Sequence, residues 1–163
     1  EQLLQIKPAA VNRAVTASLA IKSRIVKQDF SDQGVRHVLN FGHTLGHAVE
    51  SKYGLSHGES VSLGIRMAVF VSHALKRLHP EEGCRVHRLM DKLGLPSRHD
   101  SDPDEIMDAV LKDKKKRQTR IRFIGLSAIG RAEILSLSIT RFESLLKAYL
   151  SSSGFPGKEA SRA

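Results

Sequence analysis

Apolar residues recur every three or four positions along most of the chain, which is the spacing of one face of an α-helix. This spacing predicts a first helix from Pro8 to about Gln28, with proline in the first turn, where it is tolerated. Residues 29–36 are polar and predict a break. A second helix is expected over 44–53, ended by Gly54. The stretch 58–78 is apolar on nearly every side, so we expect a buried central helix there.

The second half of the chain predicts shorter elements. Helices are expected over 81–93 and from Pro103 to about Lys112, the latter opened by an Asp102 capping box. Alternating apolar residues on either side of 128–131 predict one short β-hairpin. Thr140, with Glu143 three residues on, predicts the cap of a last helix to about Leu150. We therefore expect a mainly α, multihelical domain over 1–150 and a disordered tail over 151–163.

Composition fits one soluble domain with an aliphatic core. The chain has 163 residues, is 40% hydrophobic and contains no Trp. It shows no apolar window long enough to span a membrane and no signal-peptide pattern, and its single Cys84 fits a reducing cytoplasm. Because the chain opens on Glu1, without Met and already in helical register, we expect it to be part of a longer protein.

The net charge of +9 is compatible with two kinds of anionic partner. Nucleic-acid binding is dominated by phosphate neutralisation, whereas a positive cleft equally attracts a small anionic substrate. Two Tyr and six Phe, with no interleaving of aromatic and basic residues, do not favour base stacking. We expect a small-molecule partner and no nucleic acid, with a basic nucleic-acid-binding helical module as the alternative.

Three histidines lie within fifteen residues, each beside a glycine: His43, His47 and His57. His43 and His47 are four apart and share a face if both are helical, which is the geometry of a metal-binding pair. The zinc-protease pattern is excluded because Thr44 stands where that pattern needs Glu. A catalytic zinc takes three protein ligands, and the alternative is that one or more of these histidines is structural.

Other residues could bind a metal or an anion, but none of them completes the metal site. Glu50 and Glu59 are candidate carboxylate ligands, although Glu59 could equally satisfy amides at a helix start. Lys22 lies on the apolar stripe of the first helix, so its ammonium either reaches solvent or points into a cleft to meet an anion. Arg36 is a candidate clamp for carboxylate or phosphate. The basic run 113–117 is either a solvated face or a phosphate site.

Together these segments resemble a known family. Residues 22–29, the run Arg36-His37-Val38-Leu39-Asn40-Phe41-Gly42-His43-Thr44-Leu45-Gly46-His47-Ala48-Val49-Glu50, then His57-Gly58-Glu59 with Gly64, and later Asp113-Lys114-Lys115, are similar to the C-terminal domain of 3-dehydroquinate synthase. The likeness covers roughly residues 1–150. It implies a phosphate-eliminating carbon–oxygen lyase of the shikimate pathway, which converts 3-deoxy-arabino-heptulosonate 7-phosphate to 3-dehydroquinate. NAD and zinc or cobalt are the implied cofactors.

The resemblance also implies roles for individual residues. His43 and His57 correspond to the two histidine metal ligands, and the third ligand of the family is a glutamate upstream of the region present here. His47 corresponds to a catalytic proton-transfer histidine. The positions that correspond to substrate contacts are Lys22, Arg36, Asn40, Lys114 and Lys115. A separate N-terminal domain holds NAD in the family, so we expect this chain alone to be inactive.

The chain departs from the family pattern at one position. Asp32 stands where relatives often have the glutamate treated as a proton acceptor, and its side chain is one methylene shorter. Another sugar-phosphate cyclase shares the metal histidines and is the nearest alternative. A regulatory or assembly domain derived from the enzyme is a further one. The family is often dimeric, which makes a homodimer a further expectation.

Overall fold

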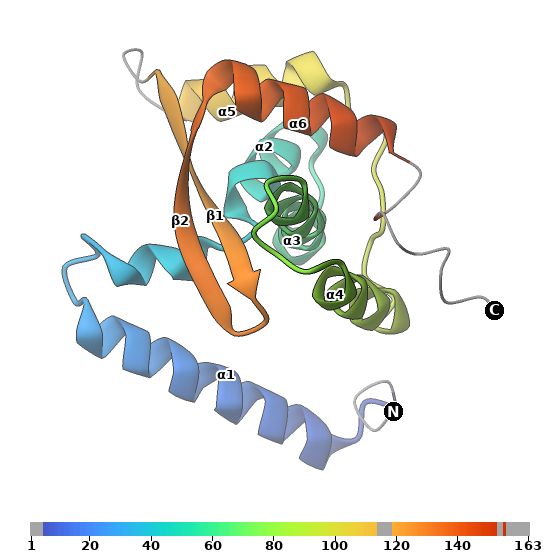
Figure 1. Ribbon diagram of the computed structural model, residues 1–163. Helices are drawn as coiled ribbons and strands as arrows, with labels where there is room; N and C mark the ends of the chain where they lie inside the picture. The colour runs from blue at the N-terminus through green and yellow to red at the C-terminus, as the bar shows by residue number, and fades with distance from the viewer. Residues whose placement is uncertain (1–4, 114–118, 153–154, 156–163) are drawn as a thin grey trace. The chain divides into compact units, whose positions relative to one another are not determined.

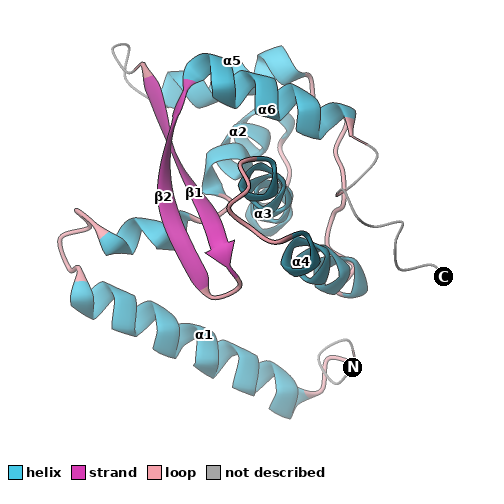
Figure 2. Cartoon of the chain, viewed as in Figure 1, coloured by secondary structure: helices cyan, strands magenta, loops and turns pink. Residues whose placement is uncertain are grey.

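The computed structural model describes residues 5–113, 119–152 and 155. The chain divides into two compact units, residues 1–39 and 40–163. Figure 2 shows helices throughout and one two-stranded ribbon, as expected for a mainly α fold with a single hairpin. The predicted fold class is confirmed.

The first unit consists of a long helix and the loop that follows it. Helix α1 spans Pro8–Gln28, the range that the sequence predicts, with Pro8 in its first turn. Asp29 ends the helix and organises the polar break, because its carboxylate accepts the backbone N–H groups of Gln33, Gly34 and Arg36 at 3.1, 2.8 and 3.0 Å. These bonds hold the pKa of Asp29 below its usual value, since they favour the charged carboxylate. A 3₁₀ helix, η1 (Val35–Asn40), follows and was not predicted.

The second unit contains five α-helices in its described residues, and some of their ends are marked by recognisable capping residues. The helices are α2 (His43–Tyr53), α3 (His57–Ala74), α4 (Pro80–Lys92), α5 (Pro103–Asp113) and α6 (Ile139–Ser151). Gly54 ends α2, as predicted, and it adopts the left-handed conformation. Ser56 and Glu59 form a reciprocal capping box at the start of α3, which lowers the pKa of Glu59.

The hairpin joins strands β1 (Arg120–Ala128) and β2 (Arg131–Ser138). The strands are antiparallel, and Ile121 and Phe123 lie opposite Leu137 and Leu135. Gly130 occupies the turn with φ of +87°, a conformation that glycine adopts without strain. The alternating apolar residues that predicted the hairpin, Ile121, Phe123 and Leu137, lie on its buried face.

Helix α3 is the centre of the second unit, and α2, α4, α6 and β1 all pack against it (Figure 1). Met67, Ala68, Val69 and Val71 are fully buried, which is the outcome expected for a run that is apolar on nearly every side. A helix enclosed in this way fixes the position of its own first turn, where His57 lies.

Several predicted boundaries need correction. Helix α3 ends at Ala74, not near Leu78, although Leu78 is buried. The cap of α6 is Ser138, whose hydroxyl accepts the Arg141 N–H at 3.2 Å, and not Thr140. The two residues differ because Ser138 is still extended and Thr140 is already helical.

The capping box predicted at Asp102 is only half formed. Asp102 accepts the N–H groups of Asp104 and Glu105 at 2.8 and 3.2 Å, as a capping residue should. The Glu105 carboxylate instead meets Tyr53 and Lys52 of α2 at 3.0 and 3.1 Å. These contacts lower the pKa of Glu105 and raise that of Lys52. They join α5 to α2.

Most of the predicted tail over 151–163 lies outside the described residues. Of its described members, Ser151 ends α6 and Phe155 is buried against Val69, Leu78 and Leu126. Among the described residues, no helix is both long and apolar enough to cross a membrane.

Candidate metal centre

The three clustered histidines come together where α2 and α3 cross. His43 and His47 lie one turn apart on α2, and His57 is the first residue of α3. The ring centroids are 5.1 Å apart for His43 and His47, 5.5 Å for His43 and His57, and 6.2 Å for His47 and His57. Residues from two separate segments therefore form one imidazole cluster, as the sequence predicts.

Glycines on both helices, two of them beside His43 and His47, allow this close crossing. A Cβ on Gly64 of α3 would overlap the carbonyl oxygen of Gly42 and lie 2.9 Å from the backbone nitrogen of Gly46. A Cβ on Gly46 would lie 3.2 Å from the carbonyl oxygen of Ser60. Gly42 has φ of +83° and a similarly crowded Cβ position. The two helices therefore meet backbone to backbone, which brings the histidine side chains within reach of one another.

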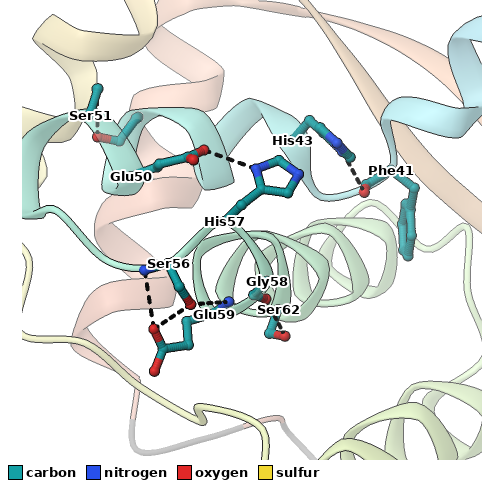
Figure 3. A network of polar contacts seen from close by, with 10 residues as sticks. Phe41, His43, Glu50, Ser51, Ser56, His57, Gly58, Glu59 and Ser62 are labelled. Atoms are coloured by element: carbon teal, nitrogen blue, oxygen red, sulfur yellow. Dashed lines mark hydrogen bonds and ion pairs between the residues drawn. The ribbon is translucent and has the colours of Figure 1, made fainter.

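Two of the three rings are held through Nδ1. His43 Nδ1 lies 3.2 Å from the carbonyl oxygen of Phe41, and His57 Nδ1 lies 3.1 Å from Oε2 of Glu50 (Figure 3). Both partners accept hydrogen bonds, so each ring donates from Nδ1 and, in its neutral form, has its lone pair on Nε2. A neutral imidazole with one nitrogen bonded in this way is the usual form of a histidine metal ligand.

The ring separations match a shared cation for two of the three pairs. A zinc–nitrogen bond of 2.0–2.1 Å puts each ring centroid about 3.2 Å from the metal, so two tetrahedral histidine ligands have centroids about 5.2 Å apart. The two pairs that include His43 fit this value, whereas His47 and His57 are farther apart. The donor set fits zinc or cobalt, with His43 as the common member.

A different trio of ligand atoms also lies close together. One atom from each of His47, Glu50 and His57 falls within 4.8 Å of the others. This trio leaves out His43, and it is looser than a tetrahedral zinc site, whose ligand atoms lie about 3.3 Å apart. Within this trio Glu50 Oε2 lies 3.1 Å from His57 Nδ1, so the carboxylate already has a hydrogen-bond partner.

The predicted substrate positions are distributed over both units. Lys22 is exposed on α1, and the Arg36 guanidinium donates to the carbonyl oxygen of Phe30 at 3.0 Å. The Asp32 carboxylate lies 3.7 Å from Nδ1 of His37, and Asp32 has φ of +55°. Lys22, Arg36 and Asp32 belong to the first unit, whereas Asn40 is exposed in the second. Lys114 and Lys115 lie outside the described residues.

Sequence reasoning missed two organising residues. Asp29 shapes the loop that carries Asp32 and Arg36, and its signal is an aspartate directly after a helix with a glycine five residues on. Arg66 is almost completely buried on α3, where it meets the carbonyl oxygens of Leu95 and Pro96 at 3.2 and 2.7 Å and the Asp91 carboxylate at 2.9 Å. An arginine in an otherwise apolar run is the signal for such a buried charge.

A separate cavity of about 110 Å³ lies beside Arg66. The Arg66 guanidinium in its wall is held by Asp91 and the two carbonyl oxygens. Its lining combines apolar and polar side chains: Leu45, Val49, Leu63, Arg66, Phe70, His87, Ser97, Arg98, His99, Ser101, Tyr149, Leu150, Ser152 and Phe155. None of the three clustered histidines is among these described lining residues.

Comparison with known proteins decides the family. The family model described as "3-dehydroquinate synthase C-terminal" matches residues 1–116. The chain belongs to this family. The 3-dehydroquinate synthase of Dehalococcoides mccartyi strain CBDB1 is 43% identical over 130 residues, which are 78% of this chain and 36% of that protein. The Nitrosomonas europaea 3-dehydroquinate synthase is 40% identical over 134 residues, covering 80% and 36%.

Solved structures share the fold of this family member. A 2-deoxy-scyllo-inosose synthase complexed with carbaglucose-6-phosphate, NAD⁺ and Co²⁺ gives a TM-score of 0.74 at 20% identity, covering 86% of this chain and 41% of that one. The 2-epi-5-epi-valiolone synthase of Streptomyces hygroscopicus subsp. jinggangensis 5008, with NAD⁺ and Zn²⁺ bound, gives 0.74 at 22% identity, covering 88% and 41%. The chain spans somewhat over a third of the length of the curated relatives it matches.

Proposed function

We propose that this chain is the metal- and substrate-binding C-terminal part of a cytoplasmic 3-dehydroquinate synthase of the shikimate pathway. The intact enzyme would convert 3-deoxy-arabino-heptulosonate 7-phosphate to 3-dehydroquinate and phosphate. The observation that carries the proposal is the convergence of three imidazole rings at the α2–α3 crossing, in a chain of this family. The curated relatives named 3-dehydroquinate synthase support the choice of reaction.

In this proposal the histidines have different roles. His43 and His57 bind zinc or cobalt through Nε2, since their Nδ1 atoms are engaged with Phe41 and Glu50. Bound metal supplies polarisation of a substrate oxygen, and bound NAD supplies reversible hydride transfer. The exposed His47 ring, 5.1 Å from that of His43, takes and returns a proton beside the metal.

The substrate carries a phosphate and a carboxylate, and cations are suited to bind both. We assign this role to Lys22, Arg36, Lys114 and Lys115, with Asn40 as a neutral hydrogen-bonding partner. Asp32 is assigned to proton transfer. The net charge of +9 favours the approach of such a dianionic or trianionic substrate.

Two parts of the site would come from outside this chain. The third metal ligand and most of the NAD pocket belong to the remainder of the enzyme, and the lengths of the curated relatives leave room for both. The isolated chain is therefore expected to be inactive.

The experiment is to join this chain to the N-terminal part of the Dehalococcoides mccartyi relative and to assay phosphate release from the heptulosonate phosphate. A matched fusion carrying both His43→Ala and His57→Ala should release none. Phosphate release from a hexose phosphate instead would identify another sugar-phosphate cyclase. A folded fusion that binds NAD and metal but releases no phosphate from either substrate would contradict an enzymatic role.

A further inference from the structure

We propose that Glu50 is a positioning residue for His57: it fixes the tautomer and the direction of the ring, so that Nε2 faces the cation site. This positioning role rests on the proposed function, because His57 is proposed there as a metal ligand. The contact that carries it is the 3.1 Å approach of Glu50 Oε2 to His57 Nδ1, seen in Figure 3.

The tautomer follows from the partner. A carboxylate only accepts hydrogen bonds, so the nitrogen that faces it carries the proton. In a neutral imidazole the other nitrogen then has the lone pair, which for His57 is Nε2. His43 is held in the same way by the carbonyl oxygen of Phe41. Two rings from different helices are thus prepared identically, one by a backbone oxygen and one by Glu50.

The exposure of the His57 side chain gives a positioning partner more to do than it would have at a buried ring. The side chain of His57 is 59% exposed, whereas that of Glu50 is 37% exposed. An exposed imidazole rotates between rotamers in solution and loses that freedom when it binds a metal. The charged acceptor on α2 reduces this cost before the metal arrives. It also ties the first residue of α3 to the helix that carries the other two rings.

The rival interpretation is that Glu50 binds the metal directly. A carboxylate ligand lies about 2.0–2.2 Å from zinc, and Glu50 is a member of the looser trio with His47 and His57. The two roles differ in what happens without metal. A positioning residue sets the His57 tautomer in the metal-free protein, whereas a ligand need not.

The first test therefore uses the 163-residue chain without metal. Long-range ¹H–¹⁵N NMR, at a pH where the rings are neutral, should show the Nδ1–H tautomer of His57. Glu50→Ala should release the ring to a mixture with the Nε2–H form, and Glu50→Gln, which keeps an acceptor oxygen, should give an intermediate population. Circular dichroism confirms that each variant is folded.

Glu59→Gln is the matched control. It removes one negative charge two residues from His57, but Glu59 contacts Ser56 and glutamine is accepted in a capping box. Its His57 tautomer should equal that of the unmodified chain. The proposal is overturned if His57 is already Nε2–H in the unmodified chain, or if Glu50→Ala leaves its tautomer unchanged.

The second test adds Co²⁺ alone, read by its visible absorption. Glu50→Gln should weaken Co²⁺ binding about 10–100-fold, the range for partners of metal ligands, and leave the spectrum at saturation unchanged. An altered spectrum would mean that Glu50 is a ligand and would overturn the positioning role. If the isolated chain binds Co²⁺ too weakly to titrate, the same comparison is made in the joined enzyme. No Co²⁺ uptake there would overturn the metal assignment of the proposed function, while the NMR result still decides whether Glu50 positions His57.

Discussion

At the residue scale, the backbone crossing at Gly64 is the most restrictive feature of the site. A Cβ there would overlap the carbonyl oxygen of Gly42 and lie 2.7 Å from its carbonyl carbon, and both are backbone atoms that cannot move aside cheaply. We therefore expect Gly64→Ala to destabilise the chain by about 3 kcal/mol or more, because α2 and α3 must separate. Chemical denaturation measures the change.

Gly58→Ala is the matched control for Gly64→Ala. Both glycines lie in α3, but a Cβ on Gly58 meets nothing within 4 Å. Alanine is favoured over glycine in helices by up to about 1 kcal/mol, so Gly58→Ala should be neutral or stabilising. Equal losses in the two variants would show that close packing at Gly64 is not what the site depends on.

The proposed proton-transfer role of His47 can be tested separately from metal binding. In the joined enzyme, His47→Ala should lower turnover about 100- to 10,000-fold, the usual range for a general acid–base group. Its metal content, measured by elemental analysis, should stay that of the unmodified enzyme. Loss of metal together with turnover would make His47 a ligand instead.

At the element scale, the buried Arg66 joins α3 to α4 and to the loop after it. Its side chain is 1% exposed, and its carboxylate partner Asp91 is 33% exposed. We expect Asp91→Ala to cost about 2–3 kcal/mol in unfolding free energy, because it removes the countercharge of a buried guanidinium. The cost is below that of a fully buried pair because Asp91 is partly solvated.

A surface ion pair provides the comparison for Asp91→Ala. Glu143 meets Lys147 at 2.8 Å one turn along α6, with both side chains well exposed. Glu143→Gln should therefore change stability by no more than about 0.5 kcal/mol. Equal losses of unfolding free energy in the two variants would show that the burial of Arg66 does not strengthen its ion pair with Asp91.

Helices, hairpin and histidine cluster could be predicted because each leaves a local signal. Apolar spacing predicted α1 with its observed range, and Gly54 predicted where α2 ends. The cap at Ser138 was missed because Thr140 and Glu143 have the same local spacing as a capping box, and only the extended backbone at Ser138 decides between them.

The remaining features depend on which elements meet, and local spacing does not encode that. Glu50 lies seven residues before His57, so sequence could suggest it as a metal ligand but could not place it on Nδ1. Arg66 finds its partners about thirty residues away. Likewise, Glu105 fits a capping box locally and is drawn away by Tyr53 of another helix.

At the scale of the whole molecule, the metal site should depend on more than this chain. We expect the zinc affinity of the isolated 163 residues, measured by calorimetry, to be at least about 100-fold below that of the joined enzyme, because one ligand is supplied from outside. Tight stoichiometric zinc binding by the isolated chain would contradict the assignment of only two ligands to it.

The alkaline limit of stability should be set by tyrosine. The chain has only two, and burial raises the pKa of both, that of Tyr149 from 10.0 to about 12. The folded state therefore keeps a proton that the unfolded state loses first. The resulting stability is complete below pH 10 and disappears as the pH rises to 12, a loss on the order of 2 kcal/mol. Phenolate absorbance follows the ionisation directly.

Tyr149→Phe isolates this effect. The Tyr149 hydroxyl lies 3.5 Å from the carbonyl oxygen of Leu63, a long contact, so its removal should cost less than about 1 kcal/mol at neutral pH. The variant should lose less stability between pH 10 and 12 than the unmodified chain, because no phenol at 149 remains to ionise. If both chains weaken equally over that range, another group governs alkaline unfolding, and the packing of α6 against α3 does not shield Tyr149 as the structure requires.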